Sequence, residues 1–187
     1  MAISTLDPRS ALIVIDLQKG IVGYPTAHPI GDVIRNAGLL IEAFRRHDLP
    51  IVLVNVTGGA PGRTDQARHT AEFPADWADL IPELKQQPID HVVTKRTWGA
   101  FSHTDLEAYL KGQGVTQVVL LGVATSIGVE STARQAHEFG FHVTLAIDAM
   151  TDMNPDAHAN SVERIFPRLG ETGTTRDIVD LLDRHRA

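Results

Sequence analysis

Five short runs rich in β-branched residues, separated by longer stretches with helical spacing, constrain this chain more than any other feature of its sequence. The runs cover residues 11–17, 51–56, 91–94, 117–121 and 142–147. They are continuously apolar rather than alternating, which is typical of strands buried on both faces of a parallel sheet. Because strands that alternate with helices form right-handed βαβ units, the pattern predicts an α/β, three-layer αβα fold, Rossmann-like, with a parallel sheet. We expect six strands, the sixth being weak and near residues 171–172.

The segments between the runs show the spacing of amphipathic helices. Apolar residues recur every three to four positions in residues 33–46, 129–139 and 157–169. Ser102 is the expected N-cap of a further helix, and Thr174 or Thr175 is expected to cap the last one. Residues 57–87 are too long for a plain connection, and segments of this length often form lids or subunit contacts.

The composition excludes several classes of protein. None of the 187 residues is a cysteine, so disulfides, thiolate metal sites and a cysteine nucleophile are ruled out. The net charge of −6 argues against a binder of nucleic acid or of anionic membranes. No apolar run approaches the ~20 residues that cross a bilayer, and residues 1–9 lack the pattern of a signal peptide. We therefore expect a single domain over residues 1–187, located in the cytoplasm.

Polar residues follow three of the runs at the edge where open parallel sheets bind their ligands. Asp16 and Gln18 end the first run, Lys95 ends the third, and residues 122–128 lead from the fourth into a helix. A carboxylate, an amide, an ammonium group and a helix N-terminus would thus meet at one edge. This combination is typical of a site with acid–base capacity and an anchor for a developing oxyanion.

Each of these candidates has a structural alternative. Asp16 follows an apolar run, where a carboxylate is either paired or shifted in pKa, but it is equally compatible with a turn cap. Lys95 suits Asp16 as a partner that would keep its carboxyl ionised, whereas most lysines lie at the surface. Trp98 and Phe101 are either walls of a small pocket or core residues. Residues 122–128 either cradle a carbonyl or an anion, or form a turn that needs glycine.

Motifs typical of a bound cofactor or metal are missing from the sequence. It contains no G-x-G-x-x-G or Walker loop for a nucleotide and no G-x-S-x-G nucleophile elbow. The nine histidines form no helical metal-binding pair, and His137 and His142 are interpreted as a helix surface and a strand start. We expect no cofactor and no metal. A flavodoxin-like cofactor binder is a weaker alternative, because a phosphate-cradling glycine loop is absent.

From about residue 11 to residue 182, the chain resembles the isochorismatase-like hydrolases, also called the cysteine hydrolase superfamily. The resemblance rests on the order and spacing of ALIVIDLQ at 11–18, Lys95 with WGAF at 98–101, and GVAT at 122–125 followed by VESTAR at 129–134. It implies a six-stranded parallel sheet flanked by helices and a small-molecule substrate. It also implies a homo-oligomer, for which residues 57–87 and the C-terminal helix are candidate contacts.

The resemblance also implies a catalytic triad, and this chain departs from it at the nucleophile. Family members have an aspartate at Asp16, a lysine at Lys95 and a cysteine three residues after Thr125. Here that third position is Gly128, so the thioester route of most relatives is closed. Ser126 carries a hydroxyl, but it does not stand at the nucleophile's position. In the family, the residues at Val123 and Ala124 are usually joined by a cis peptide bond, which turns backbone N–H groups toward the substrate.

Two functions are compatible with the glycine. The isochorismatases of this family lack the thiol: an aspartate protonates a vinyl ether and water attacks the resulting cation. By resemblance, Asp16 would be the general acid, Lys95 would orient or tune it, and Gln18 would position water or substrate. The alternative is a catalytically silent homologue, natural or engineered, that binds a small ligand. The residues that precede Gly128, 124–126, favour this alternative because they resemble the cysteine branch.

Overall fold

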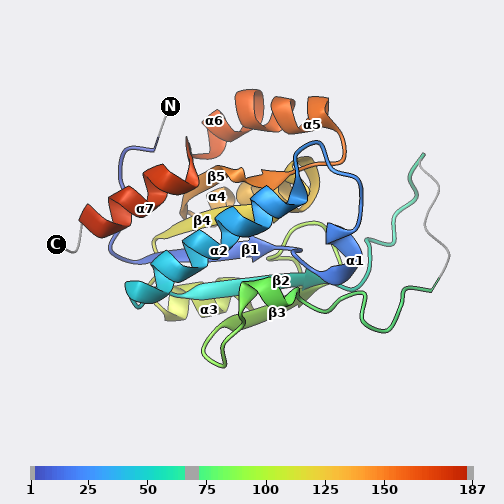
Figure 1. The fold of residues 1–187 in the computed structure, drawn as a ribbon, viewed down its shortest axis with the longest axis horizontal. Helices are drawn as coiled ribbons and strands as arrows, with labels where there is room; N and C mark the ends of the chain where they lie inside the picture. Colours follow the sequence, from blue (N-terminus) through green and yellow to red (C-terminus); the bar gives the residue numbers. More distant parts are fainter. Residues whose placement is uncertain (1–2, 66–71, 185–187) are drawn as a thin grey trace.

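Six parallel strands form one sheet in the computed structural model, which describes residues 3–65 and 72–184. Their order along the sheet is β3-β2-β1-β4-β5-β6 (Figure 1). The strands are β1 Ser10–Ile15, β2 Ile51–Val56, β3 His91–Lys95, β4 Gln117–Val123, β5 His142–Thr151 and β6 Glu171–Gly173. Each pair of neighbours is parallel. The predicted α/β class, the six strands and their parallel arrangement are confirmed.

Helices cover both faces of this sheet. They are α1 Lys19–Val22, α2 Ile30–Arg46, η1 Pro82–Leu84, α3 Leu106–Gly112, η2 Thr125–Val129, α4 Glu130–Glu138, α5 Pro155–Asn160, η3 Ser161–Ile165, α6 Phe166–Leu169 and α7 Thr175–Arg184. Helices α2 and α7 pack on one face, and α3, α4 and α6 pack on the other. In Figure 1, α2 lies in front of the sheet and α3 lies behind it. No helix in residues 3–65 and 72–184 has both the length and the apolar character needed to cross a membrane.

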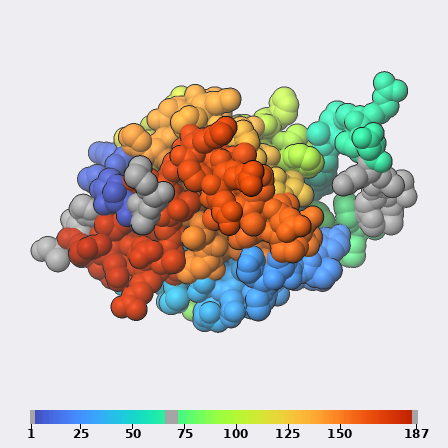
Figure 2. Space-filling view, turned by 90° about the horizontal axis from the view of Figure 1, so that it is seen from above, coloured from blue at the N-terminus to red at the C-terminus, as the bar shows by residue number. Residues whose placement is uncertain are grey.

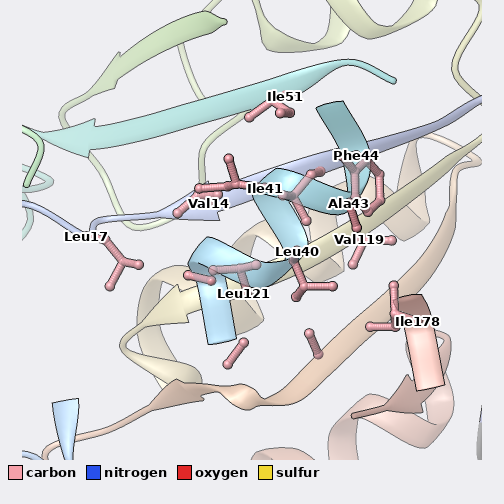
Figure 3. Close-up of a cluster of buried hydrophobic side chains, with 14 of the residues drawn as sticks. Val14, Leu17, Leu40, Ile41, Ala43, Phe44, Ile51, Val119, Leu121 and Ile178 are labelled. Atoms are coloured by element: carbon pink, nitrogen blue, oxygen red, sulfur yellow. The ribbon is translucent and has the colours of Figure 1, made fainter. Parts of the chain in front are cut away.

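The apolar stripe of α2 explains how the front layer is held. Figure 3 shows Leu40, Ile41 and Phe44 of this helix over side chains of the central strands, among them Val14 and Leu121. Full burial of a side chain of this size contributes about 1.5–3 kcal/mol. Strands β1 and β4 are buried along their whole length, as their continuous apolar runs predict.

Strand β3 differs from that expectation because it forms an edge of the sheet. Val92 is 39% exposed, and Thr94 is also exposed, whereas Val93 and Lys95 are buried. The strand is therefore half-solvated despite its apolar sequence. Its last residue, Lys95, lies on the same buried face of the strand as Val93, so the lysine side chain points inward.

Helix α3 begins later than predicted. Ser102 is not its N-cap, because the Ser102 hydroxyl accepts a hydrogen bond from Gln135 Nε2 at 2.7 Å. Asp105 occupies the N-cap position without a side-chain cap hydrogen bond. The Thr104 hydroxyl instead accepts the Leu106 N–H at 3.4 Å. The turns in between are set by contacts with α4, which lies far away in the sequence.

The two C-terminal helical segments follow the predicted pattern, and both have clear N-caps. The segment expected at 157–169 begins at Pro155, where the Asn154 side chain accepts two backbone N–H groups, and it contains the π-helical turn η3. Helix α7 is capped by Thr174. Its Oγ1 accepts the Asp177 N–H at 3.2 Å, while Asp177 Oδ2 accepts the Thr174 N–H at 2.9 Å. This reciprocal pair is a capping box.

The turn that follows β4 is a π-helix rather than the start of an ordinary α-helix. The predicted helix 129–139 is observed as α4, and η2 precedes it directly at the carboxyl end of β4. Such wide turns occur frequently at functional sites. Residues 58–65 extend from this same end of the sheet and project from the body in Figures 1 and 2. Residues 66–71 of the predicted lid or contact segment lie outside the described residues.

Candidate active site

The carboxyl ends of β1 and β3 bring Asp16 and Lys95 together. Asp16 follows β1 directly, with a φ of 52° and its backbone N–H bonded to Val54 O at 2.9 Å. Lys95 is the last residue of β3, and strand β2 lies between the two. The long lysine side chain reaches across this gap, and Nζ lies 2.8 Å from Asp16 Oδ2. The partnership predicted from the sequence is present in the structure.

The ion pair is buried, and burial decides the pKa of the carboxyl group. The side chains of Lys95 and Asp16 are 1% and 8% exposed. Lys95 Nζ also donates to Trp98 O at 2.6 Å. Asp16 Oδ1 is buried and has no hydrogen-bond partner among the described residues. Burial raises the pKa of Asp16 to about 6, although the Lys95 ammonium lowers it. Lys95 thus favours the ionised carboxyl group, as expected, but desolvation outweighs the lysine and the net pKa shift is upward.

Gly128 lies directly against this pair. A Cβ atom at Gly128 would stand 3.1 Å from Asp16 Oδ2, 3.1 Å from Lys95 Nζ and 3.0 Å from Ile15 Cγ2. All three positions of the predicted triad thus meet at one point, at the edge where strand ends bind ligands. The same contacts show that any side chain at this position requires its neighbours to shift. The bare backbone of glycine allows the carboxylate and the ammonium group to meet directly.

Gln18 has a structural role at this edge. It is fully buried. Its Oε1 accepts the Val56 N–H at 2.7 Å, and its Nε2 donates to Val56 O and Trp77 O, both at 3.1 Å. Both amide hydrogens are used, so Gln18 ties the end of β1 to β2 and to the segment that contains Trp77. The structure leaves it no hydrogen to give to a water molecule.

The two aromatic candidates, Trp98 and Phe101, differ in how far they are buried. Trp98 is 60% exposed, and its carbonyl group holds Lys95, so it is not a core residue. Phe101 is 7% exposed and packs against Phe139 and Phe141, with ring centroids 5.3 and 6.1 Å apart. Of the two alternatives for Phe101, the structure supports the core residue.

The first two residues of η2 make a second set of polar contacts. The Val123–Ala124 peptide bond is cis. The fully buried Thr125 places its Oγ1 2.8 Å from Nδ1 of His158. The Ser126 backbone N–H and hydroxyl both donate to Asp152 Oδ2, each at 2.8 Å. The Ser126 hydroxyl is therefore turned toward β5 and α5.

His28, His158 and Asp152 are residues of this edge that sequence reasoning missed. The rings of His28 and His158 are 4.5 Å apart between centroids. Burial and the neighbouring His28 lower the pKa of His158, and Asp152 opposes this effect. The available signal was the continuation of β5 through Thr151, which moves the following residues to the carboxyl edge. No group of three or more His, Cys, Asp or Glu suited to hold a metal occurs in the described part of the chain.

Comparisons with known proteins place this geometry in a family. The isochorismatase domain matches residues 10–177. An isochorismatase family protein of Bacillus subtilis, the uncharacterised YwoC, is 42% identical over 179 residues, covering 92% of this chain and 93% of its own. Nicotinamidase 3 of Arabidopsis thaliana is 31% identical over 163 residues, covering 81% of this chain and 79% of its own. The structure of an isochorismatase family protein from Burkholderia thailandensis matches with a TM-score of 0.93 at 39% identity, covering 97% of this chain and all of that one. The chain therefore belongs to the isochorismatase family of hydrolases.

Proposed function

We propose that this hydrolase acts on a small molecule by acid catalysis from Asp16, without a covalent thioester. The observation that carries the proposal is the state of the Asp16 carboxyl group. One of its oxygens is held by Lys95, while Oδ1 is buried and unpartnered among the described residues. The pKa of about 6 lies near neutral pH, where a group can hold and release a proton efficiently.

Vinyl ether hydrolysis uses such a group without a nucleophilic side chain. Protonated Asp16 gives its proton to the terminal carbon of the enol ether, and the ether-bearing carbon becomes an oxocarbenium ion. Water adds its oxygen to that carbon, and the proton it releases returns to Asp16. The resulting hemiketal breaks its carbon–oxygen bond to give a ketone and an alcohol. Lys95 holds Oδ2, so Oδ1 is the oxygen that carries the proton.

Gly128 fits this route. A Cβ atom at this position would lie 3.1 Å from Asp16 Oδ2 and from Lys95 Nζ, so a nucleophilic side chain here would require the pair to shift by a few tenths of an ångström. We assign substrate contact to Val123, Ala124 and Thr125, which lead from β4 into η2, and to Trp98, whose carbonyl group contacts Lys95. Gln18 has an indirect role, because it ties the end of β1 to β2 and to the segment that contains Trp77.

Steady-state turnover of isochorismate and of simple enol ethers of pyruvate tests the proposal. Asp16→Asn should lose at least about 100-fold in kcat, because general acid catalysis contributes 10²–10⁴-fold. Asp90→Asn is the matched control, since it changes another buried aspartate at the opposite end of the sheet. Equal turnover by the wild type and by Asp16→Asn would contradict the role of Asp16 as the general acid.

The silent homologue is the second candidate, favoured by residues 124–126 before the glycine. It predicts no turnover of any substrate by the wild type. The variant Gly128→Cys then distinguishes the loss of the thiol alone from a wider change in the site. Amidase activity in this variant would mean that only the thiol is missing, whereas no activity would mean that the surroundings have changed as well.

We also propose that the protein is a cytoplasmic homo-oligomer of single-domain chains, without nucleic-acid or membrane partners and without a cofactor. The net charge of −6 supports the absence of nucleic acid. The projecting residues 58–65 and helix α7 remain the candidate contacts. Light scattering of the purified protein measures the mass directly, and a monomer at micromolar concentration would contradict this assignment.

A further inference from the structure

Two imidazole rings stand together where the carboxyl ends of β4 and β5 meet α5. His28 comes from the segment between α1 and α2, and His158 comes from α5, 130 positions later in the chain. Their ring centroids are 4.5 Å apart, and their planes are tilted by 59°. His28 is exposed and His158 is half-buried, so both are open to a small molecule from solvent. Neither residue has a part in the acid step proposed for Asp16.

A threonine hydroxyl fixes each ring. His28 Nδ1 lies 3.0 Å from Thr151 Oγ1, and His158 Nδ1 lies 2.8 Å from Thr125 Oγ1. Thr151 Oγ1 also accepts the backbone N–H of His28 at 3.1 Å, so its own hydrogen is available for Nδ1. Both threonines are fully buried. A ring that accepts a hydrogen bond at Nδ1 carries its own proton on Nε2 and presents it as a donor.

The two Nε2 atoms have no protein partner among residues 3–65 and 72–184. Asp152, the carboxylate whose charge acts on His158, is already engaged. Its Oδ2 accepts two hydrogen bonds from Ser126, and its Oδ1 accepts the Asn154 N–H at 3.1 Å. With both Nδ1 atoms accepting from threonine hydroxyls, the two Nε2–H groups are donors without a matching acceptor among the described residues. A carboxylate group is the complement, because each of its oxygens accepts hydrogen bonds and its charge strengthens them.

The η2 turn connects this pair to the acid. Thr125, which holds His158, opens η2, and Gly128 of the same five-residue turn lies against Asp16 and Lys95. Lys95 is buried, and its Nζ already contacts Asp16 Oδ2 and Trp98 O. An anionic substrate at this edge therefore needs donors other than Lys95.

We propose that His28 and His158 form a subsite that binds a carboxylate group of the substrate through their two Nε2–H groups. The inference rests on the proposed function only in taking the ligand to be the substrate. Thr125 and Thr151 are positioning residues of this subsite. The hydrolase would then select small acids over neutral compounds of the same shape.

Binding of benzoate and benzamide to the whole protein tests the subsite, because these probes match in shape and differ in charge. Isothermal titration should show that the wild type binds benzoate at least about tenfold more tightly than benzamide. His28→Phe and His158→Phe should each lower that ratio, and the double variant should bring it to about one. His142→Phe, at the opposite end of β5, is the control and should leave the ratio unchanged. In NMR spectra, the ring signals of His28 and His158 should move with benzoate and saturate.

Equal affinity for the two probes in the wild type, or an unchanged ratio in both single variants, overturns the subsite. Asp16→Asn keeps the two hypotheses apart, because it should retain the benzoate preference. If this variant also retains turnover, the acid role fails and the subsite stands. If it loses turnover while the histidine variants keep the preference, the subsite alone fails.

Discussion

Two buried ion pairs lie at opposite ends of the sheet, and only one of them leaves a buried carboxylate oxygen without a partner among the described residues. At the carboxyl end, Lys95 Nζ is 2.8 Å from Asp16 Oδ2. At the amino end, beside the start of β3, Arg45 Nη2 is 2.6 Å from Asp90 Oδ2, with the side chain of Asp90 2% exposed. Both carboxylates are therefore enclosed and matched by a cation.

The difference lies in the remaining hydrogen bonds. Asp90 Oδ2 also accepts the Gln87 N–H at 2.8 Å, and Arg45 extends a second bond to Lys85 O at 3.0 Å. Neither oxygen of Asp90 is both buried and unpartnered, although Arg45 Nε is. Asp16 Oδ1 has no hydrogen-bond partner in residues 3–65 and 72–184, and burial raises the pKa of the Asp16 carboxyl group to about 6. In the function proposed above, this oxygen of Asp16 is the one that carries the proton.

The largest expected effect is on the pH profile of turnover. If Asp16 must be protonated to act, kcat/KM falls tenfold for each pH unit above about 6, and thus about a thousandfold by pH 9. Turnover of an enol ether between pH 5 and 9 measures this slope. Asp90→Asn should keep the same profile, because Asp90 lies at the other end of the sheet. A wild-type profile that is flat above pH 6 contradicts the acid role.

Sequence reasoning pairs Asp16 with Lys95 but does not predict the sign of the pKa shift of Asp16. Asp16 and Lys95 could be placed together because each ends a buried parallel strand, and strand ends share one edge. The balance between burial and the lysine charge depends on how completely other segments enclose the pair. The contact of Lys95 with Trp98 O and the closeness of Gly128 are tertiary facts of this kind.

The parts of the site that sequence reasoning missed join segments far apart in the chain. His28 meets Thr151 across 123 positions, and Gln18 meets Trp77 across 59. The local periodicity of the sequence does not predict such long-range contacts. Ser102 failed as a helix cap for the same reason, because its hydroxyl is engaged by Gln135 of another helix.

The next largest effect is on the pH dependence of stability. The pKa of Asp16 is about 6 in the folded protein against an ordinary value of 3.8. Between these values the folded state binds more protons than the unfolded state, so the free energy of unfolding falls as pH rises. The stabilisation is fully present below pH of about 4 and is lost above about 6, a change of about 3 kcal/mol.

Urea unfolding of the wild type and of Asp16→Asn at pH 4 to 7 isolates this contribution. From pH 4 to 7, the free energy of unfolding of the wild type should fall by about 3 kcal/mol relative to that of Asp16→Asn. Asp177 and Asp183, whose pKa values are lowered by hydrogen bonds, give the opposite slope but cancel because both proteins contain them. Parallel pH curves for the two proteins would mean that Asp16 is not shifted.

A smaller effect is expected when the pair at the amino end is broken. Asp90→Asn removes the charge that faces Arg45 and weakens the acceptor of the Gln87 N–H. The loss should be about 1–3 kcal/mol of unfolding free energy, the cost of a lost hydrogen bond to a charged group. Thermal or urea unfolding measures this loss, and turnover should stay within about twofold of the wild type. A large loss of turnover in the folded variant would remove the distinction between the two pairs.

The smallest effect belongs to an ion pair that is not buried at all. Arg35 and Asp32 approach to 2.6 Å on the surface of α2, with side chains 62% and 54% exposed. Exposed pairs of this kind contribute about 0–1 kcal/mol, because water screens the charges and ordering two side chains costs entropy. Arg35→Ala should therefore change the unfolding free energy by less than about 0.5 kcal/mol, even though this contact is as short as that of Arg45 with Asp90. If Arg35→Ala costs as much as Asp90→Asn, then distance rather than enclosure governs these pairs, and burial is not what sets Asp16 apart.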